Sequence, residues 1–174
     1  MKRIAIDMDE VIADAENRFF EWYEKDYGIK IPIEKLHGRH FPEIVDEQHM
    51  TIVKKYPWKE GFFKDLAVIK GSQEVISELV KKYEIFITTA AMEFPNSLVH
   101  KLEWLNKYFP YISWQNIVFC GDKSIIHADY MIDDSVRHFK RFTGQGILFT
   151  APHNINVDWN PRVNSWKEVG DMFL

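Results

Sequence analysis

Short apolar runs alternate along this chain with longer amphipathic segments, and this alternation limits the fold more than any other feature. The apolar runs begin at Arg3, Glu84, Asn116, Ala128 and Gly146. Each has the length and the β-branched or aromatic content of a buried strand. Strands that alternate with helices favour a parallel sheet with helices on both faces. We therefore predict an α/β fold, a three-layer Rossmann-like core around a parallel sheet.

The segments between the runs predict the helices of these layers. Apolar side chains recur in them at the spacing of one helical face. Ser72, Asn96 and Ser165 precede three of the segments and are candidate caps. The expected helices cover residues 72–83, 96–109, 135–142 and 165–174.

Residues 15–70 depart from the alternation. They contain helix-like stretches, many aromatic side chains and scattered Pro, Gly and His, but no clear buried strand. We predict a small helical cap inserted after the first strand. The expected division is a core of residues 1–14 and 71–174 and a cap of residues 15–70.

Polar side chains stand at the carboxyl ends of four predicted strands. In open α/β sheets, ligands bind outside these ends, so the side chains are expected to share one site. In chain order they are Asp7 and Asp9, Thr88 and Thr89, Asp122 and Lys123, and Asp133 and Asp134.

So many acids at one edge of the sheet would repel one another. Asp7 and Asp9 are two positions apart, so they face the same way in extended backbone. Two unit charges about 4 Å apart repel by about 4 kcal/mol at an effective dielectric near 20. Total stability is only roughly 5–15 kcal/mol. Either the groups are protonated or a cation lies between them, and a set of oxygen ligands without Cys or His favours Mg²⁺.

The other groups of this edge fit a phosphate held beside a carboxylate. Lys123 offers a compact cation and Thr89 a hydroxyl donor. Asp7 can attack phosphorus to form an aspartyl-phosphate. Asp9 can protonate the leaving oxygen and then activate water.

Four motifs, in this order, resemble those of the haloacid dehalogenase superfamily of phosphatases: DMDEVIAD, FITTA, GDKS and MIDD. The first motif, the IDD before a helix-like segment and the run LFTAPHN resemble the 5'(3')-deoxyribonucleotidases in particular. The resemblance implies an Mg²⁺-dependent phosphomonoesterase that acts on deoxyribonucleoside monophosphates.

The resemblance also implies roles for individual residues. Asp7 is the expected nucleophile and Asp9 the acid and base, while Thr89 and Lys123 hold the phosphoryl group. The implied metal ligands are the Asp7 side chain, the Asp9 backbone carbonyl and the pair Asp133 and Asp134. Which acid of this pair meets the metal directly stays open, since either can instead cap the segment that follows.

The implied cap closes over the substrate, and Phe41 and Trp58 are the candidates to contact a nucleobase. The chain departs from the family pattern at four positions. Glu10 stands where the family has a small residue, often Gly, and Ala15 stands where it has an aromatic one. Ala90 replaces a side chain with a hydroxyl, and Gly121 replaces a basic side chain.

Charge and composition limit the alternatives. The formal net charge of -4 does not favour a nucleic-acid polymer as partner. No apolar stretch approaches the roughly 18 residues of a membrane span. With a single cysteine, Cys120, and no leader-like segment, we expect a cytoplasmic protein. Two other functions stay open, a phosphatase for another small metabolite and a non-catalytic nucleotide-binding relative. A homodimer is compatible with the sequence.

Overall fold

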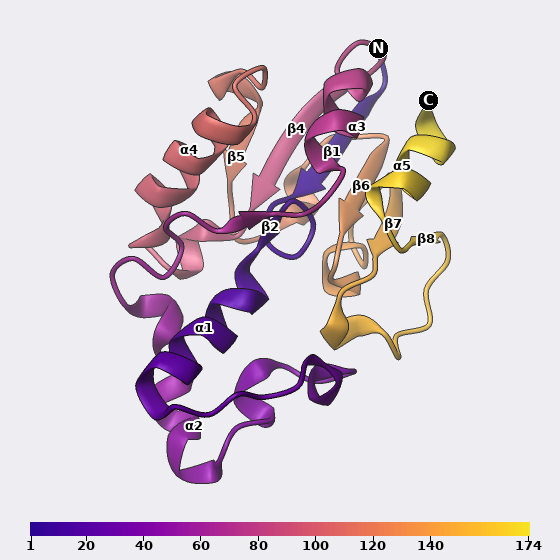
Figure 1. Ribbon diagram of the computed structural model, residues 1–174. Helices are drawn as coiled ribbons and strands as arrows, with labels where there is room; N and C mark the ends of the chain where they lie inside the picture. The colour runs from indigo at the N-terminus through magenta and orange to yellow at the C-terminus, as the bar shows by residue number, and fades with distance from the viewer.

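The computed structural model describes all residues from Met1 to Leu174 and is built around a six-stranded parallel sheet (Figure 1). The strand order is β5-β4-β1-β6-β7-β8. The strands are β1 (Arg3–Asp7), β4 (Glu84–Thr89), β5 (Ile117–Phe119), β6 (Tyr130–Asp133), β7 (Gln145–Phe149) and β8 (Arg162–Val163). The predicted α/β, Rossmann-like fold class is confirmed. Of these six strands, only β8 was not predicted, because two residues carry no hydrophobic pattern.

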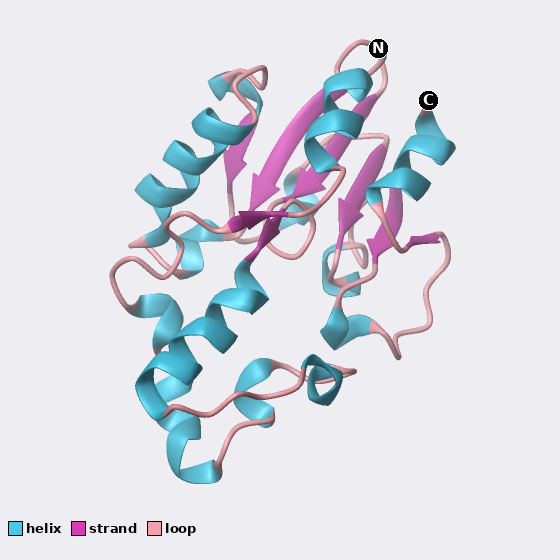
Figure 2. Ribbon diagram, viewed as in Figure 1, coloured by secondary structure: helices cyan, strands magenta, loops and turns pink.

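Three helices contribute to the main core on one face of the sheet, as the separate colours of helix and strand in Figure 2 make clear. They are α3 (Ser72–Leu79), α4 (Ser97–Tyr108) and α5 (Trp166–Phe173). Their apolar side chains pack with alternate residues of the strands, such as Ile4 and Ile6, in one cluster of 30 buried residues. This cluster fixes the helices against the sheet.

The opposite face carries Ala5, Met131 and Leu148, which pack against Phe139 and Phe142. The helix predicted over residues 135–142 is wrong, since the structure has only a 3₁₀ turn there, η7 (Val136–His138). The reason is that this short connection must return to the next parallel strand while its two Phe rings turn down onto the sheet.

Of the three residues predicted to cap helix N-termini, only one does so with its side chain. The Ser165 hydroxyl accepts a backbone N–H in the first turn of α5, as expected. Ser72 does not cap α3, because Gly71 in a left-handed conformation precedes the helix and the Ser72 hydroxyl donates to the Ile69 carbonyl. Asn96 occupies the cap position of α4, but its amide donates to two carbonyls within residues 15–70.

Residues 15–70 contain helices and 3₁₀ turns and contribute only a two-residue strand, β3 (Ala67–Val68), outside the main sheet. β3 pairs antiparallel with β2 (Ala13–Asp14), so both ends of the segment leave the core together. Figure 1 shows the segment beyond the carboxyl ends of the main strands, opposite both termini. Its assignment as a cap stays a prediction. The helical elements are α1 (Ala15–Tyr27), η1 (Ile33–Leu36), η2 (Phe41–Glu43), α2 (Glu47–Val53) and η3 (Tyr56–Trp58). No helix of the structure has both the length and the apolarity needed to cross a bilayer.

Candidate active site

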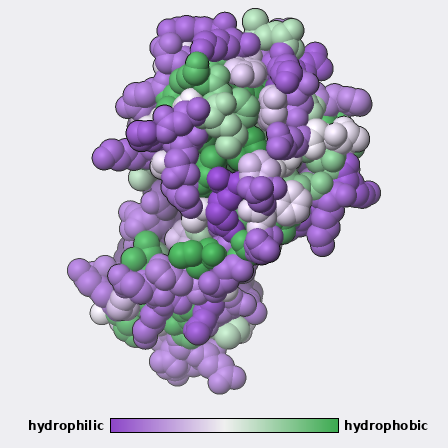
Figure 3. All heavy atoms as spheres, turned by 90° about the vertical axis from the view of Figure 1, so that its right-hand side faces the viewer, coloured by the Kyte–Doolittle hydropathy of each residue, from purple (hydrophilic) through white to green (hydrophobic).

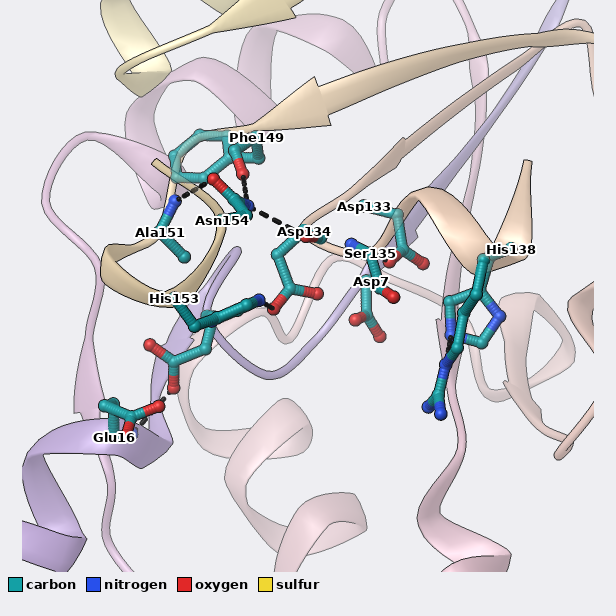
Figure 4. A network of polar contacts seen from close by, with 12 residues as sticks. Asp7, Glu16, Asp133, Asp134, Ser135, His138, Phe149, Ala151, His153 and Asn154 are labelled. Carbon is teal, nitrogen blue, oxygen red and sulfur yellow. Dashed lines mark hydrogen bonds and ion pairs between the residues drawn. The ribbon is translucent and has the colours of Figure 1, made fainter. Parts of the chain in front are cut away.

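The carboxyl ends of β1 and β6 bring three carboxylates together. Asp7 ends β1, and Asp133 and Asp134 end and follow β6, its parallel neighbour. One oxygen of each side chain lies within 4.8 Å of the other two. The predicted meeting of these residues at one edge of the sheet is therefore seen in the structure (Figure 4).

Lys123 lies between two of these carboxylates and is itself buried. Its Nζ is 2.6 Å from Asp7 Oδ1 and 2.7 Å from Asp133 Oδ2, and its side chain is 1% exposed. Burial alone would lower the pKa of Lys123, but the two carboxylates outweigh burial and raise it. The ammonium therefore stays charged inside the protein.

Burial raises the pKa values of two of these acids. Burial raises the pKa of Asp7 to about 7, although Lys123 opposes this shift. Burial likewise raises the pKa of Asp133 to about 6 against the same lysine. A group with a pKa near neutrality is partly protonated, and a bound cation would favour the ionised form. A cation bound among these acids would therefore keep them ionised.

Hydrogen bonds distinguish the two acids of the pair. Both oxygens of Asp133 are bound, Oδ2 to Lys123 and Oδ1 to the backbone N–H of Ser135 at 2.9 Å. Asp134 uses only Oδ2, which lies 3.1 Å from His153 Nε2. Figure 4 shows its other oxygen on the side of Asp7. The residues present fit a divalent cation held by oxygen atoms, and Asp134 rather than Asp133 has an oxygen to offer.

Asp9 lies outside the cluster of three and pairs with a different lysine. Its Oδ2 forms an ion pair with Lys101 of α4, and Lys101 also donates to Thr89 Oγ1 at 3.0 Å. The ammonium of Lys101 lies 4.8 Å from the centre of the Phe63 ring. The second oxygen, Asp9 Oδ1, is buried and has no protein partner. This oxygen is therefore available to a reacting group.

Sequence reasoning missed Lys101. The usable signal was that Lys101 lies three and four positions before Trp104 and Leu105, which are buried, so it falls on the helix face that normally carries apolar residues. The predicted apolar face is confirmed at Leu105 and Phe109, which are buried, but Leu102 is exposed and the neighbouring Lys101 is buried. The predicted apolar face consisted of Leu98, Leu102, Leu105 and Phe109.

The predicted role of Asp9 as a general acid can be tested at its partner. With that role, Lys101→Met should lower kcat by about 100-fold with a smaller change in KM, because general acid catalysis contributes about 10²–10⁴-fold and Asp9 would lose its orienting partner. The measurement is turnover of aryl phosphates with leaving groups of different pKa. The loss should shrink for good leaving groups, which need no proton. Lys107→Met, an exposed position on the same helix, serves as control. Equal losses for all leaving groups would contradict a role for Lys101 in proton transfer.

Asp7, Asp9, Lys123 and Asp134 line a cavity of about 580 Å³ between the edge of the sheet and residues 15–70, whereas Thr89, Lys101 and Asp133 do not reach it. Figure 3 shows two lobes with a hollow at their junction. A second cavity of about 590 Å³ shares Glu10 and Glu16 with the first but contains none of the predicted catalytic residues. The lining of the first includes Asp7, Asp9, Lys123 and Asp134 from the core side and Ala15, Phe19, His40, Phe62 and Phe63 from the other.

Phe41 and Trp58, the predicted base contacts, do not line this cavity. Phe41 is 1% exposed and packs on Phe19 and Phe20 inside the segment, with ring centroids 5.5 and 4.7 Å away. Trp58 is 55% exposed and packs edge-on against Phe94, with ring centroids 4.7 Å apart. The aromatic side chains that do line the cavity are Phe19, Phe62, Phe63 and Phe94.

Glu10, one of the departures from the family pattern, occupies a backbone position with φ 59 that glycine adopts without strain. Its carboxylate accepts the backbone N–H of Glu16 at 2.7 Å, at the start of α1. Burial, followed by the charges of Glu16, Asp14 and Asp134, raises the pKa of Glu10 well above its usual value. The remaining three departures are Ala15 and Ala90, which line the cavity, and Gly121, where a side chain would meet open space.

Solved structures of other proteins share this fold. A haloacid dehalogenase-like family hydrolase from Streptococcus pneumoniae covers 100% of this chain and 99% of its own, with a TM-score of 0.64 and 13% identity. A haloacid dehalogenase family hydrolase from Deinococcus radiodurans, solved with bound phosphate and sodium, has a TM-score of 0.64 and 12% identity over 97% and 93% of the two chains. The fold is that of the haloacid dehalogenase-like hydrolases.

Sequence comparison identifies the family within that class. The family model described as 5' nucleotidase, deoxy (pyrimidine), cytosolic type C protein matches residues 1–174. The 5'(3')-deoxyribonucleotidase of Bacillus subtilis is 42% identical over 97% of this chain and 96% of its own. A candidate 5'(3')-deoxyribonucleotidase of Staphylococcus aureus is 45% identical over 99% and 96%. The chain belongs to this 5' nucleotidase family and is a phosphomonoester hydrolase.

Proposed function

We propose that this protein hydrolyses deoxyribonucleoside 5'- and 3'-monophosphates in an Mg²⁺-dependent reaction through an aspartyl-phosphate on Asp7. The observation that carries the proposal is the joint placement of Asp7, Lys123 and Asp134 at one end of the cavity. The activity named for the Bacillus subtilis relative supports the choice of substrate.

In the first step, Asp7 attacks phosphorus with Oδ2, since its Oδ1 already accepts from Lys123 and from the Met8 backbone N–H. The bond from phosphorus to the leaving oxygen breaks, and Asp9 Oδ1 gives that oxygen its proton. Thr89 is fully buried behind the cavity lining and accepts from Lys101, so we assign to it the positioning of Lys101 beside Asp9 rather than a direct contact with the phosphoryl group. The products are the nucleoside and a phosphorylated Asp7.

In the second step, Asp9 takes a proton from water, and the water oxygen attacks the phosphorus on Asp7. The bond between phosphorus and the Asp7 oxygen breaks, which releases inorganic phosphate and restores the carboxylate. Lys123 offsets negative charge in both steps. Bound Mg²⁺, held by Asp7, the Asp9 backbone carbonyl and Asp134, would supply the further positive charge that the transferring phosphoryl group needs.

Residues 15–70 act in this proposal as a cap that selects the substrate. The cavity of about 580 Å³ lies within the range of roughly 300–1,000 Å³ that small-molecule sites occupy. We assign the contact with the nucleobase to the lining rings rather than to Phe41 and Trp58. These rings are Phe19, Phe62, Phe63 and Phe94.

The test is phosphate release from a panel of deoxynucleotides, ribonucleotides, sugar phosphates and an aryl phosphate. We expect the highest kcat/KM with deoxynucleoside monophosphates, and a loss of at least about 100-fold on chelation that Mg²⁺ restores. Higher kcat/KM with sugar phosphates would identify a phosphatase for another small metabolite. Nucleotide binding without any turnover would identify a non-catalytic relative.

A further inference from the structure

The cavity is short of positive charge for a site that receives a phosphate dianion. Lys123 and Arg137 are the only lysine or arginine side chains in its lining, and Lys123 is held by two carboxylates. A bound metal would offset only part of the negative charge. The acids of the lining are Asp7, Asp9, Glu10, Glu16, Glu93 and Asp134.

Arg137 differs from Lys123 because it is exposed and forms no ion pair. Its Nε donates to His138 Nε2 at 3.3 Å, which leaves both terminal nitrogens of the guanidinium without a protein acceptor. Burial lowers the pKa of His138 to about 4, with Lys123 and Arg137 adding to the effect, so its ring is neutral and accepts this bond. The guanidinium is thus oriented by a neighbour and free to bind an anion.

We propose that Arg137 binds the phosphate group of the incoming substrate at the cavity entrance, a role that rests on the proposed phosphatase function. A guanidinium presents paired N–H donors that match two oxygens of a phosphate. Arg137 lies in η7, which only Ser135 separates from Asp134, so the acids and the free cation come from one short stretch of chain. Because no bond changes at Arg137, its contribution belongs to substrate capture.

A nearby arginine provides a matched control. Arg141 lies four residues further along the chain and is exposed, but it pairs with Asp122 and does not line the cavity. Removing either arginine changes the net charge by the same amount. A difference between the two variants therefore reports position rather than total charge.

The experiment compares Arg137→Gln, Arg137→Lys and Arg141→Gln with an aryl phosphate and a deoxynucleoside monophosphate. For Arg137→Gln we expect KM to rise about tenfold, or about 1.4 kcal/mol, with kcat within about twofold of wild type. Arg137→Lys should recover part of the loss and Arg141→Gln should behave as wild type. The salt dependence of kcat/KM should also become shallower in Arg137→Gln.

Calorimetric titration of inorganic phosphate into the Mg²⁺-loaded protein separates this proposal from the proposed function. We expect a Kd about tenfold weaker in Arg137→Gln alone. If phosphate binds more weakly to Arg137→Gln alone but the wild-type protein hydrolyses no phosphomonoester, the proposed function is refuted. Arg137 would then still be an anion-binding residue. Unchanged KM and phosphate Kd in Arg137→Gln, equal losses in Arg141→Gln, or a fall in kcat alone would each overturn the proposal.

Discussion

Asp7→Asn is expected to abolish turnover and leave the protein folded. The amide has the shape of the carboxylate but is no nucleophile toward phosphorus, so kcat should fall by about 10⁴-fold or more. The fold should survive because Lys123 keeps Asp133 as a partner. The measurement is turnover of an aryl phosphate together with the thermal unfolding temperature. Asp122→Asn, an acid outside the cavity, is the control.

Trapping of the covalent intermediate is a second test of Asp7 as the nucleophile. Wild-type protein mixed with radiolabelled substrate and quenched in acid should carry label, and Asp7→Asn should carry none. Asp9→Asn should accumulate label from a substrate with a good leaving group, because the second step lacks its base. An active Asp7→Asn variant, or label that persists in it, would show that another residue is the nucleophile.

Lys123→Met is expected to damage both stability and activity. It leaves Asp7 and Asp133 buried without their shared cation, and breaking a buried pair costs about 3–5 kcal/mol of the free energy of unfolding. Turnover should fall by about 10³-fold, since a preorganised charge at the transferring phosphoryl group is lost. Thermal unfolding and kcat are measured on the same preparation.

The effect of Mg²⁺ on thermal unfolding tests whether the lost stability of Lys123→Met comes from the lost positive charge. Mg²⁺ should raise the unfolding temperature of Lys123→Met more than that of the wild type, because it would replace the missing positive charge. Lys123→Arg should keep most of the stability but not the turnover, because the guanidinium has a different shape. A Lys123→Met protein that melts like the wild type, with or without Mg²⁺, would mean that the two ion pairs do not stabilise the fold.

The edge of the sheet could be predicted from the sequence because hydrophobic runs locate buried strands and parallel strands end at one edge. Asp7, Lys123 and Asp133 meet there for this reason. Lys101 could not be found this way, since its burial depends on the exact rotation of α4 about its axis. The short turn η7 depends on packing against the sheet rather than on local periodicity.

The region from residue 15 to residue 70 was the least predictable part. It is so rich in aromatic residues that the sequence does not show which rings face inward. Phe41 and Phe62 are both fully buried in the packed core, yet only Phe62 also borders the cavity. The difference arises from how α1 and the 3₁₀ turns pack on one another, which no single segment encodes.

The short ribbon of β2 and β3 carries both chain crossings between the sheet and residues 15–70. The two adjacent crossings place the entry and the exit of the segment side by side. Further contacts hold it to the core, among them the hydrogen bond from Trp104 Nε1 to the Leu66 carbonyl. Because both ends of the segment join the core at one place, another segment could replace it without a change in the sheet. A homologous insert would have to match the four ribbon residues and the few contacts with α4, a small requirement that would allow substrate preference to diversify while the hydrolytic residues stay constant.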